Sequence, residues 1–249
     1  MPQKGRRARR QRSETRIQKL KRLVRSMPAR IGARRDLRRP ELARGYGVLN
    51  GQAGRQAAVS GMFQHIDFDL VVETGTYRGT TTEFLRTLTR APIVTIEVDE
   101  RLAFYSQARL QTLPDVRVVH GDSATEIRRL VFGRGRYSRL PFCYLDAHWH
   151  ARLPLRWEIL EVLSAFPECC ILIDDFQVPT DAGYRFDDYG RGFRLTPDLL
   201  DGLDLHDVEW FWPAVPATQE TGYKRGWLVL ARGETVVTVL RAIPELRQA

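Results

Sequence analysis

Five short apolar segments, each ending at an acidic or polar residue, constrain the fold of this chain more than any other feature. Helical patterns separate them, as in the spacing of Phe84, Leu85 and Leu88. Apolar strands that alternate with helices predict an α/β fold whose parallel sheet is covered on both faces. Ligands of such sheets bind outside the carboxyl ends of the strands, where these acids collect. The five segments are residues 71–73, 93–97, 116–120, 142–146 and 170–175.

The first segment runs into a turn bracketed by glycine, Glu-Thr-Gly-Thr-Tyr-Arg-Gly at residues 73–79. Gly75 and Gly79 let the backbone turn and approach a ligand closely. The glycine order differs from the dinucleotide fingerprint Gly-x-Gly-x-x-Gly, and an acid at the strand end would repel a pyrophosphate. The cationic methionine end of S-adenosylmethionine suits Glu73 better. A capping box of Thr80 and Glu83 is expected to start the next helix.

Two further strand ends are expected to complete a nucleoside site. Glu97 ends the second segment about twenty residues after the turn, where nucleoside-binding folds place a carboxylate on the ribose hydroxyls. The third segment ends in Gly-Asp-Ser, and we expect Asp122 and Ser123 near the adenine.

The C-terminal part of the chain has a different pattern. Residues 208–212 and 227–231 are strand-like and are joined by the polar, turn-rich stretch 216–226, which favours an antiparallel hairpin. The segments Glu-Thr-Gly-Thr-Tyr-Arg-Gly, Ile-Glu-Val-Asp, His-Gly-Asp-Ser, Tyr-Leu-Asp-Ala-His-Trp and Ile-Asp-Asp-Phe occur in this order within residues 60–232. With this set the chain resembles the class I S-adenosylmethionine-dependent methyltransferases. Within them it is similar to metal-dependent O-methyltransferases of the macrocin type, distantly akin to catechol O-methyltransferase.

The resemblance implies a Rossmann-like fold with a mostly parallel seven-stranded sheet, an antiparallel C-terminal hairpin and helices on both faces. It also implies S-adenosylmethionine as cofactor. The residues expected to bind it are Glu73, Gly75, Thr76, Tyr77, Gly79, Glu97, Asp122 and Ser123.

Three acids at neighbouring strand exits suggest a metal site. Asp146, Asp174 and Asp175 would repel one another unless a cation compensates. A hard ion such as Mg²⁺ takes oxygen ligands and keeps positions for water or substrate. The related metal-dependent enzymes carry an acid after strand four and an acidic pair after strand five, as here. The alternative is that Asp174 and Asp175 only cap a loop.

Methyl transfer to a hydroxyl needs a base, and His148 is our candidate because it lies two residues beyond Asp146 and an ordinary histidine titrates near neutrality. We assign both residues to the catalytic site, with His150 as the second candidate for the base. The macrocin-type relatives often have a carboxylate at the position of His148, so this assignment departs from their pattern. The alternative is that both histidines are surface loop residues.

Residues 177–194 form a long connection rich in aromatic and charged side chains. Long loops of this kind are often functional lids, so Tyr184, Phe186, Tyr189 and Phe193 are candidates to cover an acceptor. An Ω-loop that packs on itself is the alternative.

The positive charge of the chain lies in its N-terminal arm. Residues 1–40 hold 16 of the 39 lysines and arginines and only two acids, Glu14 and Asp36, which leaves +14 there and −5 in the rest. A helix is expected from Ser13, with apolar residues at helical spacing among basic ones. We expect residues 1–44 to form a basic arm, partly helical or disordered, and residues 45–249 to form the catalytic domain. Such an arm can bind nucleic acid or an anionic membrane surface, and the alternative is a solvated, partly disordered tail.

The sequence contains neither a membrane-spanning run nor the apolar core of a secretory signal, so we expect a cytoplasmic location. Cys143, Cys169 and Cys170 lie in or beside expected strands and are interpreted as packing residues rather than a disulfide or zinc set.

Three classes of function fit these observations. The first is metal-assisted O-methylation of a small hydroxylated acceptor such as a sugar or natural-product moiety, with homo-oligomers possible. The second is a nucleic-acid methyltransferase that uses the basic arm, although Leu-Asp-Ala-His stands where amino-methylating enzymes carry Asn-Pro-Pro-Tyr or Asp-Pro-Pro-Tyr. The third is a non-catalytic module with the same fold.

Overall fold

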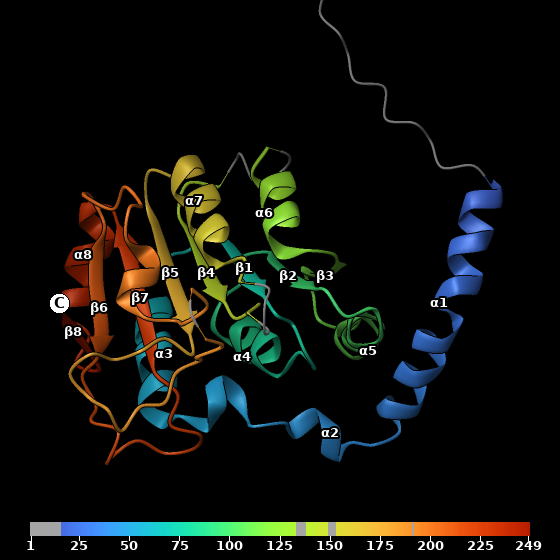
Figure 1. Ribbon diagram of the computed structural model, residues 1–249, viewed down its shortest axis with the longest axis horizontal. Coiled ribbons are helices and arrows are strands. Elements are labelled where there is room, and N and C mark those ends of the chain that lie inside the picture. The colour runs from blue at the N-terminus through green and yellow to red at the C-terminus, as the bar shows by residue number, and fades with distance from the viewer. Residues whose placement is uncertain (1–15, 133–137, 149–152, 191) are drawn as a thin grey trace, which may run out of the picture.

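A computed structural model describes residues 16–132, 138–148, 153–190 and 192–249. Its centre is an eight-stranded sheet with the strand order β3-β2-β1-β4-β5-β7-β6-β8 (Figure 1). The first five strands are parallel, and the last three pair antiparallel. The strands are β1 (Leu70–Thr74), β2 (Ile93–Glu97), β3 (Val116–His120), β4 (Pro141–Leu145), β5 (Cys169–Asp174), β6 (Glu209–Pro213), β7 (Trp227–Arg232) and β8 (Leu246–Gln248).

Helices cover both faces of this sheet. Helices α6 and α7 pack on one face, α3, α4 and α8 on the other, and α5 lies beside β2 and β3. The helical segments are α1 (Arg16–Leu37), α2 (Glu41–Arg44), η1 (Val48–Gly51), α3 (Ala53–His65), α4 (Thr80–Leu88), α5 (Glu100–Leu110), α6 (Ser123–Phe132), α7 (Leu155–Ala165), η3 (Pro197–Leu200) and α8 (Glu234–Arg241).

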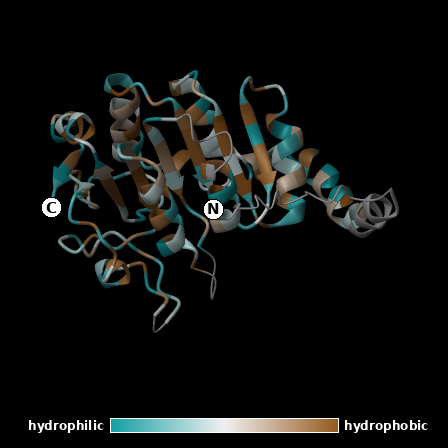
Figure 2. Cartoon of the chain, turned by 90° about the horizontal axis from the view of Figure 1, so that it is seen from above, coloured by the Kyte–Doolittle hydropathy of each residue, from teal (hydrophilic) through white to brown (hydrophobic). Residues whose placement is uncertain are grey.

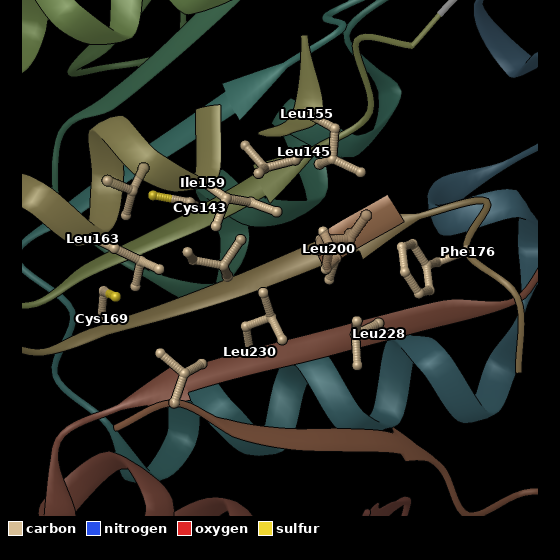
Figure 3. Close-up of a cluster of buried hydrophobic side chains, with 14 of the residues drawn as sticks. Cys143, Leu145, Leu155, Ile159, Leu163, Cys169, Phe176, Leu200, Leu228 and Leu230 are labelled. Carbon is tan, nitrogen blue, oxygen red and sulfur yellow. The ribbon is translucent and has the colours of Figure 1, made fainter. Parts of the chain in front are cut away.

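Alternation along the strands divides the core into two layers. Val71 belongs to the layer under α3, whereas Val72 belongs to the layer under α7, because successive strand side chains point to opposite faces. Figure 2 shows the resulting concentration of hydrophobic residues along the strands. In Figure 3, Cys143 and Leu145 of β4 lie against Leu155 and Ile159 of α7. The three cysteines are buried and free, as expected for packing residues.

The predicted fold class is confirmed, with one addition. The sheet has an eighth strand, β8, which pairs with β6 at the edge. Its three residues are too few to give a recognisable alternation in the sequence. Strands β4 and β5 each end one residue before the expected position, so Asp146 and Asp175 lie just beyond the strand ends.

Helix α1 makes the described part of the N-terminal arm a packed element. Ala33 is buried, the Arg30 guanidinium lies 4.1 Å from the centre of the Phe104 ring on α5, and Asp36 pairs with Arg101 at 2.7 Å. Residues 1–15 lie outside the described part. Within the described residues, no helix combines the length and apolarity needed to cross a bilayer.

The strand order places a topological switch between β1 and β4. From β1 the chain moves to β2 and β3 on one side, and from β4 it moves to β5 on the other. The connecting loops diverge there, and in open α/β sheets the ligand site lies outside the carboxyl ends of such a pair. The turn after Thr74 and the segment after Leu145 flank this point.

Candidate functional site

The turn after β1 needs glycine at two positions, because the backbone there has positive φ angles and lies close to neighbouring atoms. Gly75 and Gly79 have φ angles of +80° and +76°, which disfavour any residue with a Cβ. A Cβ on Gly75 would lie 2.2 Å from the carbonyl oxygen of Asp146, and one on Gly79 would lie 2.8 Å from the Leu110 side chain. Gly75 therefore lets the turn after β1 lie directly against the segment after β4.

The capping box predicted at the start of α4 is wrong. The helix begins after Gly79 without a side-chain cap, and the Thr80 hydroxyl instead donates to the carbonyl oxygen of Ala43 at 2.7 Å. Glu83 forms an ion pair with Arg109. Thr80 thus joins the turn after β1 to α2, the short helix that follows α1. The spacing of residues in the sequence does not reveal this contact.

Glu73 lies beneath the turn rather than on its surface. Its side chain is 1% exposed and accepts a hydrogen bond from the Thr82 hydroxyl, while the hydroxyls of Thr76 and Thr95 bond each other at 2.6 Å. Burial raises the pKa of Glu73 to about 7, although hydrogen bonds from Thr82 and Thr95 oppose the shift. The carboxyl group therefore lies within the protein and ties β1 to α4.

Glu97 fixes the turn from the neighbouring strand. Its carboxylate accepts hydrogen bonds from the backbone N–H of Tyr77 at 2.7 Å and of Asp99 at 2.8 Å. Burial raises its pKa, and these hydrogen bonds oppose the rise. Tyr77 has a φ of +48°, an uncommon value for a residue with a Cβ, and its ring is exposed. One carboxylate therefore holds two loops at the predicted cofactor site.

Asp122 and Ser123 lie at the start of α6. The Asp122 carboxylate accepts from the backbone N–H of Thr125 at 3.1 Å and from its hydroxyl at 2.7 Å, so it caps the helix. Ser123 is buried beside Glu158 of α7, a residue that sequence reasoning missed. Burial raises the pKa of Glu158 to about 7, and neither of its oxygens has a hydrogen-bond partner among the described residues.

Three side chains converge beyond the ends of β4 and β5. Asp146, His148 and Asp175 each offer a ligand atom, and these atoms all lie within 4.8 Å of one another. His148 Nε2 is 3.8 Å from an oxygen of Asp146. Its side chain is almost fully buried, and within the described residues neither ring nitrogen has a hydrogen-bond partner. Burial lowers the pKa of His148 to about 4, so the imidazole is neutral near pH 7.

Asp174, the third predicted metal ligand, is engaged elsewhere. Arg55 of α3 pairs with it at 2.7 Å, and the Asn50 side-chain amide donates to both of its oxygens at 3.2 and 3.4 Å. The Tyr144 hydroxyl and the backbone N–H of Asp175 also donate to it. Burial alone would raise the pKa of Asp174, but the charge and hydrogen bonds of Arg55 outweigh it and hold the pKa below its usual value. The ligand atoms of Asp146 and Asp175 lie with that of His148, and Asp174 lies beside them with its oxygens engaged by other groups.

Asp175 is a strained and partly compensated acid. It has a φ of +53° and pairs with Arg225, which also contacts Asp187. Burial, and then the nearby charge of Asp174, raise the pKa of Asp175 to about 7. The pKa of Asp146 is raised by burial and by both neighbouring acids. Such a group of acids fits a bound cation, which would compensate their mutual repulsion.

The long loop reaches this site in part. Tyr184 is buried and donates to the carbonyl oxygen of Val215 at 2.8 Å, so it packs against the connection between β6 and β7. The Tyr189 hydroxyl donates to Asp187, and its oxygen also lies 3.2 Å from the carbonyl oxygen of His148. Phe193 remains 39% exposed. Among the four aromatic residues proposed as a cover, Tyr189 has a described contact with the acid cluster.

Arg55 and Arg225 contact the acids of the site, but the sequence analysis did not identify them. Arg55 has a readable signal, because Ala58, Val59 and Met62 follow it at helical spacing on the buried face of α3. A lone arginine on an apolar helix face requires a buried partner. Arg225 lies in the hairpin connection and has no such pattern. His150, the second candidate for the base, lies outside the described residues.

Comparisons with known proteins agree with this architecture. No family model matches the sequence, and no curated protein matches it. Among solved structures, an O-methyltransferase from Bacillus cereus in complex with SAH aligns over 83% of this chain and 91% of its own, with a TM-score of 0.56 and 16% identity. The O-methyltransferase TomG from Streptomyces achromogenes, involved in tomaymycin synthesis and solved in complex with SAM, aligns over 72% of this chain and 80% of its own (TM-score 0.50, 20% identity).

Cofactor-bound Rv0187 from MTB is a further similar structure, covering 85% of this chain and 95% of its own with a TM-score of 0.50 and 18% identity. At these identities the likeness establishes the fold. The chain has the fold of class I S-adenosylmethionine-dependent methyltransferases.

Proposed function

We propose that this chain is an S-adenosylmethionine-dependent methyltransferase that methylates a hydroxyl oxygen of a small acceptor. The observation that carries the proposal is the contact of Gly75 with the backbone of Asp146. It places the turn expected to hold the methyl donor next to the acids expected to hold the acceptor. Methyl transfer is an in-line displacement, so bringing donor and acceptor together in the correct orientation accounts for much of the catalysis.

The cofactor is proposed to lie across the turn after β1. In this arrangement Gly75, Thr76, Tyr77 and Gly79 form the backbone beside the methionine end, with Glu73 beneath them. The carboxylate oxygens of Glu97 each retain a lone pair beyond the two backbone bonds and would accept from the ribose hydroxyls. Ser123 and Asp122 would lie near the adenine. Neighbours of the same fold were solved with SAH and with SAM bound, which supports this placement.

The acceptor is proposed to bind beside Asp146 and Asp175, with a divalent ion between protein and substrate. An ion at this position would orient the acceptor hydroxyl and make it more acidic. The oxygen ligands of the two acids favour Mg²⁺ as this ion. Tyr189 and Asp187 border this position and would contact the acceptor.

A screen for methylated products tests the proposed function. The full chain is incubated with methyl-labelled S-adenosylmethionine and a library of small hydroxylated compounds, and labelled products are identified by mass spectrometry. We expect transfer to at least one compound, and the loss of transfer in Asp146→Asn. Transfer to RNA or DNA alone would favour the nucleic-acid methyltransferase instead.

The partner of the N-terminal arm, the location in the cell and the oligomeric state stay predictions. The basic arm is proposed to meet an anionic partner, in keeping with the exposed Arg34 and Arg35 on α1. A cytoplasmic location and a homo-oligomeric state are likewise proposals, testable by fractionation and by light scattering.

A further inference from the structure

The site beyond β4 and β5 contains a nitrogen donor where sequence reasoning expected only carboxylates. We infer that Asp146, His148 and Asp175 bind a divalent first-row transition ion, such as Fe²⁺, Co²⁺ or Zn²⁺, in preference to Mg²⁺. The inference deepens the proposed function and rests on it only for what the ion does in the reaction. It makes His148 a metal ligand instead of the base, and it removes Asp174 from the ligand set.

The geometry of the three side chains fits one ion. Two ligand atoms that each lie about 2.1 Å from a metal are separated by at most about 4.2 Å. The three ligand atoms here lie within 4.8 Å of one another, and His148 Nε2 is 3.8 Å from Asp146. Small side-chain rotations therefore suffice to bring all three onto a single ion.

His148 provides the independent evidence that this is a built site and not only a cluster of acids. Its side chain is 1% exposed, and within the described residues both ring nitrogens are without a hydrogen-bond partner. Buried polar groups are normally satisfied, so an imidazole without a partner among the described residues, beside two carboxylates, points to a ligand. A cation is the ligand that all three groups share.

Asp174 is unavailable because its oxygens already have partners. Arg55 lies 2.7 Å from one oxygen, Asn50 donates to both, and Tyr144 donates to the second. A metal ion there would have to displace a buried guanidinium. Asp175 differs, because Arg225 engages only one of its oxygens in the described contacts.

The donor set then determines the preferred ion. Mg²⁺ demands oxygen ligands and gives up its water reluctantly. Imidazole suits iron, nickel, copper and zinc, and affinity for a mixed nitrogen and oxygen site rises from Mn²⁺ towards Cu²⁺. One histidine and two carboxylates leave the remaining positions of such an ion open for water or an acceptor hydroxyl.

The test is metal binding by the full chain, independent of turnover. Calorimetric titrations with Co²⁺ and Mg²⁺ should show Co²⁺ binding at least about tenfold more tightly. Pulsed electron paramagnetic resonance of the protein loaded with Mn²⁺ should show coupling to a nitrogen nucleus. His148→Ala should remove this coupling and weaken Co²⁺ binding at least about tenfold, while Mg²⁺ binding changes little.

Two controls make the outcome decisive. His65→Ala changes an exposed histidine at the end of α3 and should leave both readouts unchanged. If His148→Ala unfolds, the nitrogen coupling in the unmodified protein still decides, since its absence overturns the inference. Mg²⁺ binding as tightly as Co²⁺ would also overturn it.

The affinity for S-adenosylmethionine, measured on the same samples, distinguishes the metal site from the proposed function. Cofactor binding without metal binding refutes the metal site and leaves the methyltransferase proposal standing.

Discussion

Arg55 and Asp174 form an ion pair of 2.7 Å in which the side chains are 0% and 2% exposed. The pair joins α3 to the end of β5, directly beneath the acid cluster. Tyr144 and Asn50 complete the hydrogen bonds of the carboxylate. Each buried charge compensates the other, while Nε and Nη2 of Arg55 have no hydrogen-bond partner among the described residues. The pair therefore fixes the floor of the proposed acceptor site.

The first prediction concerns this pair. Arg55→Met leaves Asp174 buried without its counter-charge, so we expect a loss of about 3–5 kcal/mol in the free energy of unfolding, measured in urea. The double variant Arg55→Met, Asp174→Asn should recover a large part of the loss, because no charge remains buried. Arg101→Met removes a pair whose arginine is half exposed and should change stability little. Equal effects for Arg55→Met and Arg101→Met would contradict the assigned role.

The second prediction uses the titration of Glu73. Its pKa is about 7 in the folded chain because of burial, above the ordinary 4.5. The folded state thus holds a proton that the unfolded state releases, so this group costs stability as the pH rises from 4.5 through 7. Glu73→Gln removes that cost. The variant should gain stability relative to the unmodified protein between pH 5.5 and 8, by about 3 kcal/mol at most. A difference that does not change with pH would show that Glu73 is not buried as described.

Most of the fold could be predicted from the sequence because its signals are local. Apolar runs broken by helical patterns gave the parallel strands, and the turn-rich stretch before Trp227 indicated the hairpin. The site could be predicted only in part, because the partners of the acids come from distant segments. Arg55 is 119 positions before Asp174 in the chain, and Arg225 is 50 positions after Asp175. Local spacing also gave a wrong prediction at Thr80, whose hydroxyl donates to the carbonyl oxygen of Ala43, a residue 37 positions earlier in the chain.

The third prediction concerns the N-terminal arm. A chain beginning at Gly45 should fold and bind S-adenosylmethionine, because the removed residues contribute no strand to the sheet. It loses the packing of Ala33 on α5, the pair of Asp36 with Arg101 and the Ala43 contact to Thr80, so a modest fall in melting temperature is expected. A second chain beginning at Arg39 keeps Ala43 and isolates the contribution of α1. Failure of both chains to fold would mean that α1 is part of the domain.

The fourth prediction distinguishes the role of the ion in methyl transfer from the binding of S-adenosylmethionine. Chelation or Asp146→Asn should abolish methyl transfer and leave the affinity for S-adenosylmethionine within about twofold, because the proposed ion contacts the acceptor. Asp146→Asn is a sharper test than Asp174→Asn, since the latter also leaves Arg55 unpaired. Transfer is followed with a labelled methyl group, and affinity by calorimetry. Undiminished transfer in excess chelator would leave a metal-independent methyltransferase.

A valine at Gly75 is a poor test of cofactor binding, although Gly75 is expected to lie against the cofactor. The new side chain would collide with the Asp146 carbonyl oxygen and would distort the protein itself. Loss of binding would then have two explanations. Glu97 is the preferred position because a smaller side chain there collides with nothing, and its carboxylate both holds the turn and is the group expected to meet the ribose.

Calorimetric titration of the full chain with S-adenosylmethionine tests the central claim most directly. The proposed cofactor site predicts saturable binding with one site per chain. Glu97→Ala removes the carboxylate that holds Tyr77 and Asp99 and should weaken binding at least about tenfold, or about 1.4 kcal/mol. Glu234→Ala, at the start of α8 and away from the switch point, should bind as the unmodified chain does. No saturable binding, or equal affinity in Glu97→Ala, would contradict the proposed site.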